Sequence, residues 1–253
     1  MKSLPIVRWW GSQVLWATQF VGVGIGQALL NLKYYRYKRI VYALIITNAA
    51  SVLLFLLRLI GSDSFRYWFM LWNLALAWTA PFIAWLLIER LKRASWRHWS
   101  NIALTVLWIG FLPNSFYMVS DLIHVRPTGE VSIIFDAVLF SSFIFNGFVA
   151  GYIGSYFVHR ELIRRRGEMK AYAMIIGVFA LASYAIYLGR VLRWNTWDAI
   201  FHPAGLIFDV SDNILNPLAH PQAFVVTLSF TLLITVFYLF AYEVLRVLKL
   251  TRR

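Results

Sequence analysis

Residues 111–124 read Phe-Leu-Pro-Asn-Ser-Phe-Tyr-Met-Val-Ser-Asp-Leu-Ile-His, and the interpretation of the whole sequence depends on this stretch. It starts as the apolar end of a membrane-length segment, which Pro113 is expected to break. Four polar side chains then follow at spacings of three, four and three: Asn114, Tyr117, Asp121 and His124. At about 100° per residue they fall within roughly 80° of arc, so a helix would present them as one polar stripe at the edge of a bilayer.

The composition is that of a polytopic membrane protein. Of 253 residues, 60% are hydrophobic and 14% are charged, and the mean hydropathy is +0.66. Soluble domains carry about 25% charged residues, so this chain lies outside their range. Amphipathic aromatic rings settle at membrane interfaces, which suits the 12 Trp and 13 Tyr. The absence of cysteine excludes disulfides and thiolate metal sites.

The net charge of +13 is explained by the membrane rather than by nucleic acid. Most basic residues lie in four short segments beside hydrophobic stretches, at 33–39, 90–97, 160–170 and 246–253. Cytoplasmic loops of membrane proteins carry such an excess of Lys and Arg. We therefore expect the lipid bilayer as the partner, no nucleic acid, and these segments in the cytoplasm.

Six hydrophobic stretches are long enough to cross a bilayer as helices, which takes about 20 residues each. They cover residues 40–59, 68–88, 101–119, 133–158, 171–188 and 223–244. A seventh, 14–32, also contains several Gln and Gly residues. The basic segments alternate with the spans, which places loops 60–67, 120–132 and 189–222 outside and the C-terminus in the cytoplasm. The sequence predicts an all-α, polytopic transmembrane helix bundle of seven spans, with six as the alternative, in the cell (inner) membrane.

Polar residues on the outer side come from three separate places. The first is the stripe at 114–124, and the second is Asp136 at the start of the span 133–158. The third follows the span 171–188 and contains Arg190, Arg193, Asn195, Trp197 and Asp198. All three lie at a similar depth, and ionisable groups there rarely face lipid. We therefore expect them to meet in one outward-facing polar cluster.

Three segments also resemble a known family. They are Trp72-Asn-Leu-Ala-Leu-Ala-Trp78, the stretch 111–124, and Leu188-Gly-Arg-Val-Leu-Arg-Trp-Asn-Thr-Trp-Asp198. These look like the Asn-Leu-x-Leu-Ala-Trp, Pro-Asn-x-x-Tyr-x-x-x-Asp-Leu-x-His and Gly-Arg-x-x-Arg-Trp-Asn-Ser-Trp-Asp signatures of an uncharacterised bacterial integral-membrane family. The resemblance covers roughly residues 40–245. It implies a six-helix membrane domain at 40–253 and an N-terminal extension at 1–39 that holds an extra transmembrane helix, but no activity.

One interpretation is that the cluster is the active site of a metal-assisted hydrolase or transferase. Asp121 and His124 would act as ligands of a divalent metal such as zinc or as acid and base groups, with Asp136, Asp198 or His202 completing the set. Arg190 and Arg193 would hold the anionic group of a lipid-linked or other small molecule. Other polar groups of the cluster would line the substrate: Asn114, Tyr117, Asn195 and Trp197.

Other interpretations of the polar cluster stay open, and the sequence does not decide whether the protein is an enzyme. In one of them Asp121, Asp136 and Asp198 form ion pairs with Arg190 and Arg193 that hold the helices together. A small-solute or ion transporter and a non-catalytic membrane scaffold are the remaining alternatives. His98 and His159 fall in basic cytoplasmic segments, so both are expected to be exposed to solvent.

Overall fold

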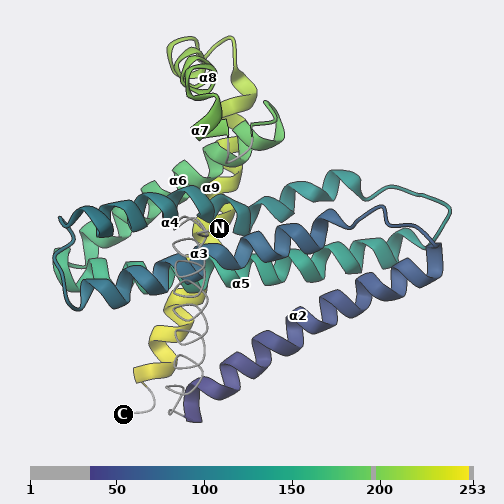
Figure 1. Ribbon diagram of the computed structural model, residues 1–253, viewed down its shortest axis with the longest axis horizontal. Coiled ribbons are helices and arrows are strands. Elements are labelled where there is room, and N and C mark those ends of the chain that lie inside the picture. Colours follow the sequence, from purple (N-terminus) through teal and green to yellow (C-terminus); the bar gives the residue numbers. More distant parts are fainter. Residues whose placement is uncertain (1–34, 195–197, 251–253) are drawn as a thin grey trace, which may run out of the picture. The chain divides into compact units, whose positions relative to one another are not determined.

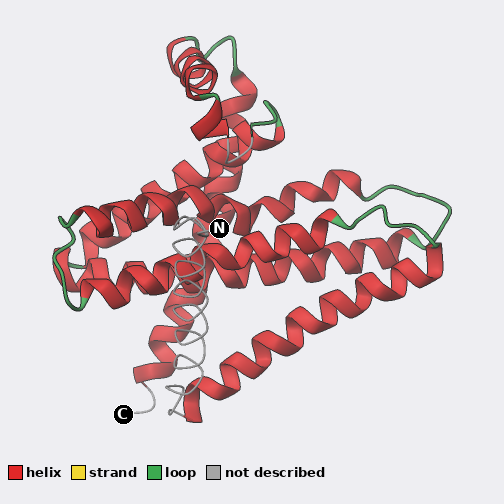
Figure 2. Ribbon diagram, viewed as in Figure 1, coloured by secondary structure: helices red, strands yellow, loops and turns green. Residues whose placement is uncertain are grey.

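The computed structural model describes residues 35–194 and 198–250, and these are helical with short connections (Figures 1 and 2). The helices are α2 (Tyr35–Ser62), α3 (Phe69–Leu91), α4 (Trp99–Tyr117), the 3₁₀ helix η1 (Met118–His124), α5 (Ile133–Arg166), α6 (Glu168–Arg190), α7 (Asp198–Phe201), α8 (Pro203–Leu215) and α9 (Pro221–Leu250). The described residues contain no strand, so the all-α prediction is confirmed.

Six helices of the described part are long and apolar enough to cross a membrane. These candidate spans are Arg39–Ser62, Phe69–Leu91, Trp99–His124, Ile133–Arg166, Glu168–Arg190 and Pro221–Leu248. Each contains most of one predicted hydrophobic stretch, which confirms a polytopic helical membrane protein. The predicted span 14–32 lies outside the described residues.

The chain divides into two compact units, Met1–Ala49 and Ala50–Arg253, and α2 crosses the boundary between them. Of the first unit, the structure describes the N-terminal half of α2. In the second unit, α3 packs along both α4 and α5, α6 packs against α4 and α5, and α9 packs against α6. Successive helices α3 to α6 run in alternating directions (Figure 1). Two ends result: the basic end, residues 89–99 and 160–170, and the network end, residues 58–68, 118–136 and 189–194.

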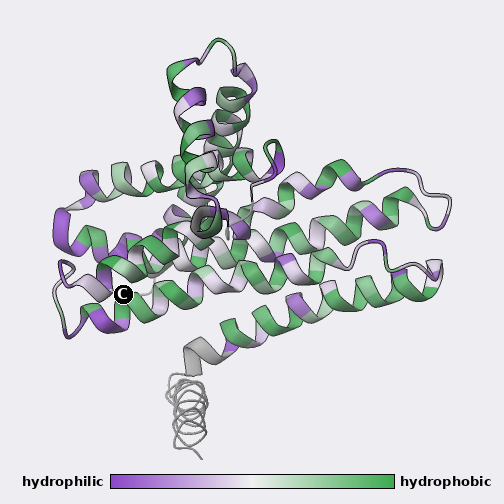
Figure 3. Ribbon diagram, turned by 45° about the horizontal axis from the view of Figure 1, so that its top comes forward, coloured by the Kyte–Doolittle hydropathy of each residue, from purple (hydrophilic) through white to green (hydrophobic). Residues whose placement is uncertain are grey.

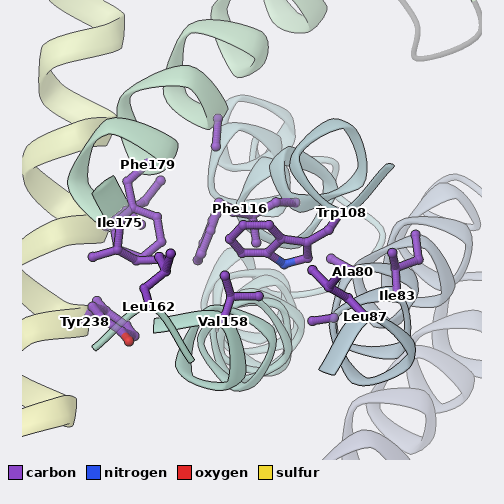
Figure 4. Packing of buried hydrophobic residues seen from close by; sticks show 14 of the residues in the cluster. Ala80, Ile83, Leu87, Trp108, Phe116, Val158, Leu162, Ile175, Phe179 and Tyr238 are labelled. Carbon is purple, nitrogen blue, oxygen red and sulfur yellow. The ribbon is translucent and has the colours of Figure 1, made fainter. Parts of the chain in front are cut away.

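The core between these helices is built mainly from large apolar side chains. Trp108 and Phe116 of α4 face Val158 of α5, and Phe179 of α6 faces Tyr238 of α9 (Figure 4). All five are at most 2% exposed. Outside this core, the spans expose apolar residues, and hydrophilic residues gather mostly at helix ends and loops (Figure 3). Such a surface is stable only when lipid covers it.

Three glycines of α5 allow α3 and α4 to approach it closely. A Cβ on Gly147 would lie 2.4 Å from the Ser115 carbonyl oxygen, and one on Gly151 would lie 2.6 Å from the Phe116 ring. A Cβ on Gly154 would lie 3.1 Å from the Pro81 backbone. Small residues serve this purpose in membrane helix packing. The glycines therefore hold α4, and the residues that follow it, against α5.

Pro113 does not break the third span. α4 continues through Pro113 to Tyr117, and η1 then extends the same rod to His124. Neighbouring helices and side chains can compensate for a proline inside a membrane helix. Here the Asn114 side chain donates to the Phe111 carbonyl at 3.2 Å, within the turn that holds the proline.

Candidate functional site

The centre of the network end is an ion pair between Asp121 of η1 and Arg190 at the end of α6. Asp121 is 2% exposed. One carboxylate oxygen accepts from the Arg190 guanidinium, and the other accepts from the Asn73 side-chain amide of α3 at 2.9 Å. A single carboxylate thus joins three helices that are far apart in the sequence.

Arg190 is held from several sides. Its Nε donates to the Ser120 hydroxyl at 2.8 Å, and its guanidinium carbon lies 4.4 Å from the centre of the Tyr117 ring. One terminal nitrogen lies 3.4 Å from Nε2 of His124. Nevertheless 20% of the Arg190 side chain remains exposed. The result is a cation of fixed orientation that still reaches the surface.

The 3₁₀ geometry of η1 explains why Asp121 and His124 face the same arginine. Side chains three residues apart eclipse one another in a 3₁₀ helix, which has three residues per turn. The predicted stripe is therefore assembled in part: Tyr117, Asp121 and His124 all contact Arg190. Asn114 instead bonds to its own helix.

His124 is exposed, and its hydrogen bond defines its tautomer. An arginine can only donate, so Nε2 must act as the acceptor and the proton of a neutral ring must reside on Nδ1. The imidazole also packs edge-on against Phe69, with ring centres 5.4 Å apart. The Nδ1 side of the ring has no hydrogen-bond partner within the described chain. His124 can therefore donate a hydrogen bond to a molecule outside the protein.

Arg193 lies just beyond α6 in a strained backbone conformation. Its φ of 62° is in the left-handed region, which few residues other than glycine adopt. The conformation closes the helix, because the Trp194 amide returns to the Leu188 carbonyl at 3.1 Å. The Arg193 side chain is exposed, and no acidic side chain of the described residues pairs with it.

Asp136 belongs to a second ion-pair group, not to that of Arg190. It accepts from Arg58 of α2 at 2.8 Å, and both side chains are 1% exposed. Arg58 also pairs with Glu130 at 3.1 Å, and Glu130 pairs with Arg66 at 2.8 Å. The alternative in which Asp136 pairs with Arg190 or Arg193 is wrong for this residue, because Arg58 already neutralises its carboxylate inside the bundle.

Tyr67 connects the two groups. Its hydroxyl lies 3.3 Å from the His124 carbonyl oxygen and 3.4 Å from the Asp136 carboxylate, and its ring lies 4.2 Å from the Arg58 guanidinium. Burial raises the pKa of the Tyr67 phenol above its usual value, and the negative charge of Asp136 adds to this. The phenol therefore stays neutral, and its single proton can be donated to either acceptor. Tyr67 thus lies between the ion-pair group of Arg190 and that of Arg58, and the two groups are neighbours at this end of the helices.

The last predicted site residues lie in the connection after α6. Asp198 begins α7 and lies 3.4 Å from His202, whose side chain is 70% exposed. Asn195 and Trp197 lie outside the described residues. Residues 35–194 and 198–250 hold no group of three His, Asp or Glu side chains that could bind a metal ion. In the arrangement seen, the proposed ligands Asp121 and His124 both face the cation Arg190, so the zinc site stays a prediction that requires Arg190 to move.

The prediction that His159 is exposed to solvent is wrong. It is completely buried, because α5 continues to Arg166 and keeps this residue inside the bundle at the basic end. Nδ1 lies 2.9 Å from the Tyr238 hydroxyl, and the rings of Tyr172 and Tyr242 pack on the imidazole with centres 4.8 Å away. His98 is exposed as predicted, and its ring caps the start of α4.

Several residues of the network were not predicted from the sequence: Arg58, Tyr67, Ser120 and Glu130. A signal existed for Arg58, because an arginine inside a span almost always has an acidic partner within the bundle. Ser120 and Tyr67 carry no such signal. Their roles depend on where η1 and α6 meet, which one sequence does not show.

The comparisons with known proteins give a family but no activity. The family model described as "Protein of unknown function (DUF1361)" matches residues 72–237, which include Asn73, the stretch 111–124 and Arg190. No curated protein and no solved structure matches the chain. The matched region covers well over half of the sequence and contains the motifs on which the resemblance rested. This integral membrane protein therefore belongs to the DUF1361 family.

Proposed function

We propose that the network end binds the anionic group, a phosphate or carboxylate, of a lipid-linked or other small molecule, with Arg190, His124 and Arg193 as the contacting groups. The observation that carries this proposal is the state of Arg190. Its guanidinium is fixed by Ser120, Asp121 and the Tyr117 ring, yet a fifth of the side chain stays exposed. A binding group that is already ordered loses little entropy when a ligand arrives.

The local charge also favours an anion. Asp121 balances Arg190, and Asp136 and Glu130 balance Arg58 and Arg66. Arg193 then adds a positive charge that no described acidic residue neutralises. The exposed Asp63 and Arg126 are also at this end and cancel one another in the sum, so the excess of one positive charge remains. An anion that bridges Arg193 and the exposed edge of Arg190 would complete the charge balance at the surface. Arginine suits this role because its planar fork of donors matches phosphate and carboxylate.

The donors around the site have defined roles. The Ser120 hydroxyl donates to the Tyr117 carbonyl at 2.6 Å and accepts from Arg190, so its proton and one lone pair are already used. Ser120 therefore orients Arg190 and does not act as a nucleophile. His124 keeps an outward N–H, which can donate to a bound oxyanion or exchange a proton with it. A hydrolytic or transfer reaction at this site would use His124 as its acid or base.

The basic segments lie at the opposite end of the helices, which supports, by the positive-inside rule, our assignment of this site to the outer face of the membrane. Candidate ligands are then the headgroups of the outer leaflet or anionic solutes outside the cell. Both present the same chemistry, so the test must distinguish a lipid from a soluble anion.

Native mass spectrometry of the purified protein gives that test. Phosphatidylglycerol, phosphatidylcholine and inorganic phosphate are offered separately to the wild type and to His124→Gln. We expect retention of phosphatidylglycerol over phosphatidylcholine, with a several-fold loss in His124→Gln. Retention of phosphate alone would identify a soluble anion as the ligand. Equal retention of both lipids and no phosphate, unchanged by the substitution, would refute the proposal.

A further inference from the structure

The helix α8 carries an apolar face that no part of its own compact unit covers. Ile207, Phe208, Ile214, Leu215 and Leu218 are between 64% and 96% exposed. At about 100° per residue the four of them within the helix lie within roughly 120° of arc, and Leu218 follows in the turn after Asn216, so the apolar face runs along the helix and its C-terminal turn. Soluble monomeric proteins rarely expose an apolar stripe of this kind.

The polar face of α8 points the other way, toward the protein. Asp209 accepts from the Trp194 indole at 2.7 Å, and the Asn213 side chain donates to the Tyr184 hydroxyl at 3.2 Å. Trp194 also packs on α8, where a Cβ on Gly205 would lie 2.9 Å from the indole ring. The helix is thus attached through its polar side, and its outward side is apolar except for the half-buried Ser211. This orientation is the reverse of that of a helix on the surface of a soluble protein.

The chain fixes the depth of α8. It lies between the end of α6 at Arg190 and the start of α9 at Pro221, so both of its connections are at the same end of candidate spans. With 13 residues it is about 20 Å long, too short to cross a hydrocarbon core of about 30 Å. In Figure 1 the axis of α8 points toward the viewer and α9 runs from the top of the view to the bottom, so α8 lies transverse to this span.

We propose that α8 is an interfacial helix that lies in the leaflet at the network end, with its apolar face among the acyl chains. The occupant of this face is lipid because the face continues a surface that lipid already covers. Leu218 is followed after three residues by the start of α9, whose exposed side carries Phe224, Val225 and Leu228. Free amphipathic helices bind membranes with the help of Lys and Arg, and α8 has neither. Its attachment to Trp194 and Tyr184 takes the place of that electrostatic attraction.

This inference does not depend on the proposed anion site, and a test of it requires no ligand. The chain contains no cysteine, so single cysteines can be introduced and spin-labelled without further changes. Phe208→Cys and Leu215→Cys report on the apolar face, and Val210→Cys is the control at a half-buried position beside that face. Ser95→Cys, in the exposed loop at the basic end, is the reference for water.

The labelled proteins are reconstituted in vesicles of phosphatidylethanolamine and phosphatidylglycerol, and collision rates with oxygen and with a soluble nickel chelate are measured. We expect an oxygen-to-nickel ratio at positions 208 and 215 that is several-fold above that at position 95, and little access to either reagent at 210. Preferential access of nickel at 208 and 215 would show a water-exposed helix and overturn the proposal. Low access to both reagents there, with or without dipolar broadening between two copies, would show that protein covers the face and would also overturn it.

Discussion

Asp121 and Arg190 form an ion pair across 69 positions of the chain, and the carboxylate is almost completely buried. The pair joins η1 to α6, and Asn73 adds α3 through the second carboxylate oxygen. The same pair therefore fastens three helices and fixes the guanidinium that we assign to anion binding. Structural and binding roles are combined in one group of side chains, so substitutions must separate them.

Asp121→Asn is expected to lower the free energy of unfolding by about 1–3 kcal/mol, because a largely buried arginine loses its charge partner while one hydrogen bond survives. Glu89→Gln is the matched control. It removes the carboxylate of the exposed Glu89–Lys92 pair and is expected to change stability by less than about 0.5 kcal/mol. Chemical unfolding in detergent checks both values. Equal effects of the two substitutions would show that the Asp121–Arg190 pair is no stronger than a surface pair.

Arg58→Met is expected to destabilise the protein by about 3–5 kcal/mol, since it leaves the buried Asp136 carboxylate without its main partner. Adding Asp136→Leu to Arg58→Met should recover most of this loss, because both buried charges are then gone. The double-mutant cycle of unfolding free energies measures this coupling, and additive losses would contradict the pairing.

Gly147→Ala is expected to destabilise the bundle, because the new Cβ would meet the backbone oxygen of Ser115 and one helix would have to shift. Gly177→Ala is the control, since nothing lies within 4 Å of its Cβ. Alanine at position 177 should be neutral or stabilise by up to about 1 kcal/mol through helix propensity. Thermal unfolding of both variants tests this difference, and a tolerated alanine at 147 would refute the close approach of α4 and α5.

Ionisation of the Tyr67 phenol at high pH is expected to lower the stability of the folded protein. Its pKa is raised in the folded protein by burial, so the neutral phenol is favoured by folding. The corresponding stability is fully present below the unfolded pKa of about 10 and is lost as the pH rises toward the folded pKa. Between pH 9 and about pH 11 the wild type should therefore lose more stability than Tyr67→Phe, as measured by unfolding at each pH. Parallel pH profiles of the two proteins would contradict this assignment.

The fold could be predicted from the sequence because apolar length alone identifies membrane helices. The ends of the helices could not. Hydropathy places the end of the fourth span near residue 158, whereas α5 continues through polar residues to Arg166 and buries His159 on the way. The basic clusters are thus partly helical extensions and not only loops.

The polar network could be predicted only in part. Asp121 and Arg190 are predicted to lie at a similar depth in the membrane, and their ion pair was among the alternatives that the sequence left open. Arg58 was counted as part of an apolar stretch, although its charge inside a span required a buried acid such as Asp136. Tyr67 and Ser120 owe their roles to tertiary contacts between distant segments. No local pattern specifies such contacts.

The most direct test of the proposed function is the dissociation constant for a short-chain phosphatidylglycerol, measured in detergent for the wild type and three single substitutions. Arg193→Gln and His124→Gln remove exposed groups of the proposed site, whereas Arg126→Gln removes an exposed charge two residues beyond His124 that the site does not use. We predict roughly fivefold or greater weakening for the first two substitutions, the equivalent of about 1 kcal/mol, and less than about twofold for Arg126→Gln. Equal weakening by all three, or by none, would show that the network end does not form a specific anion site.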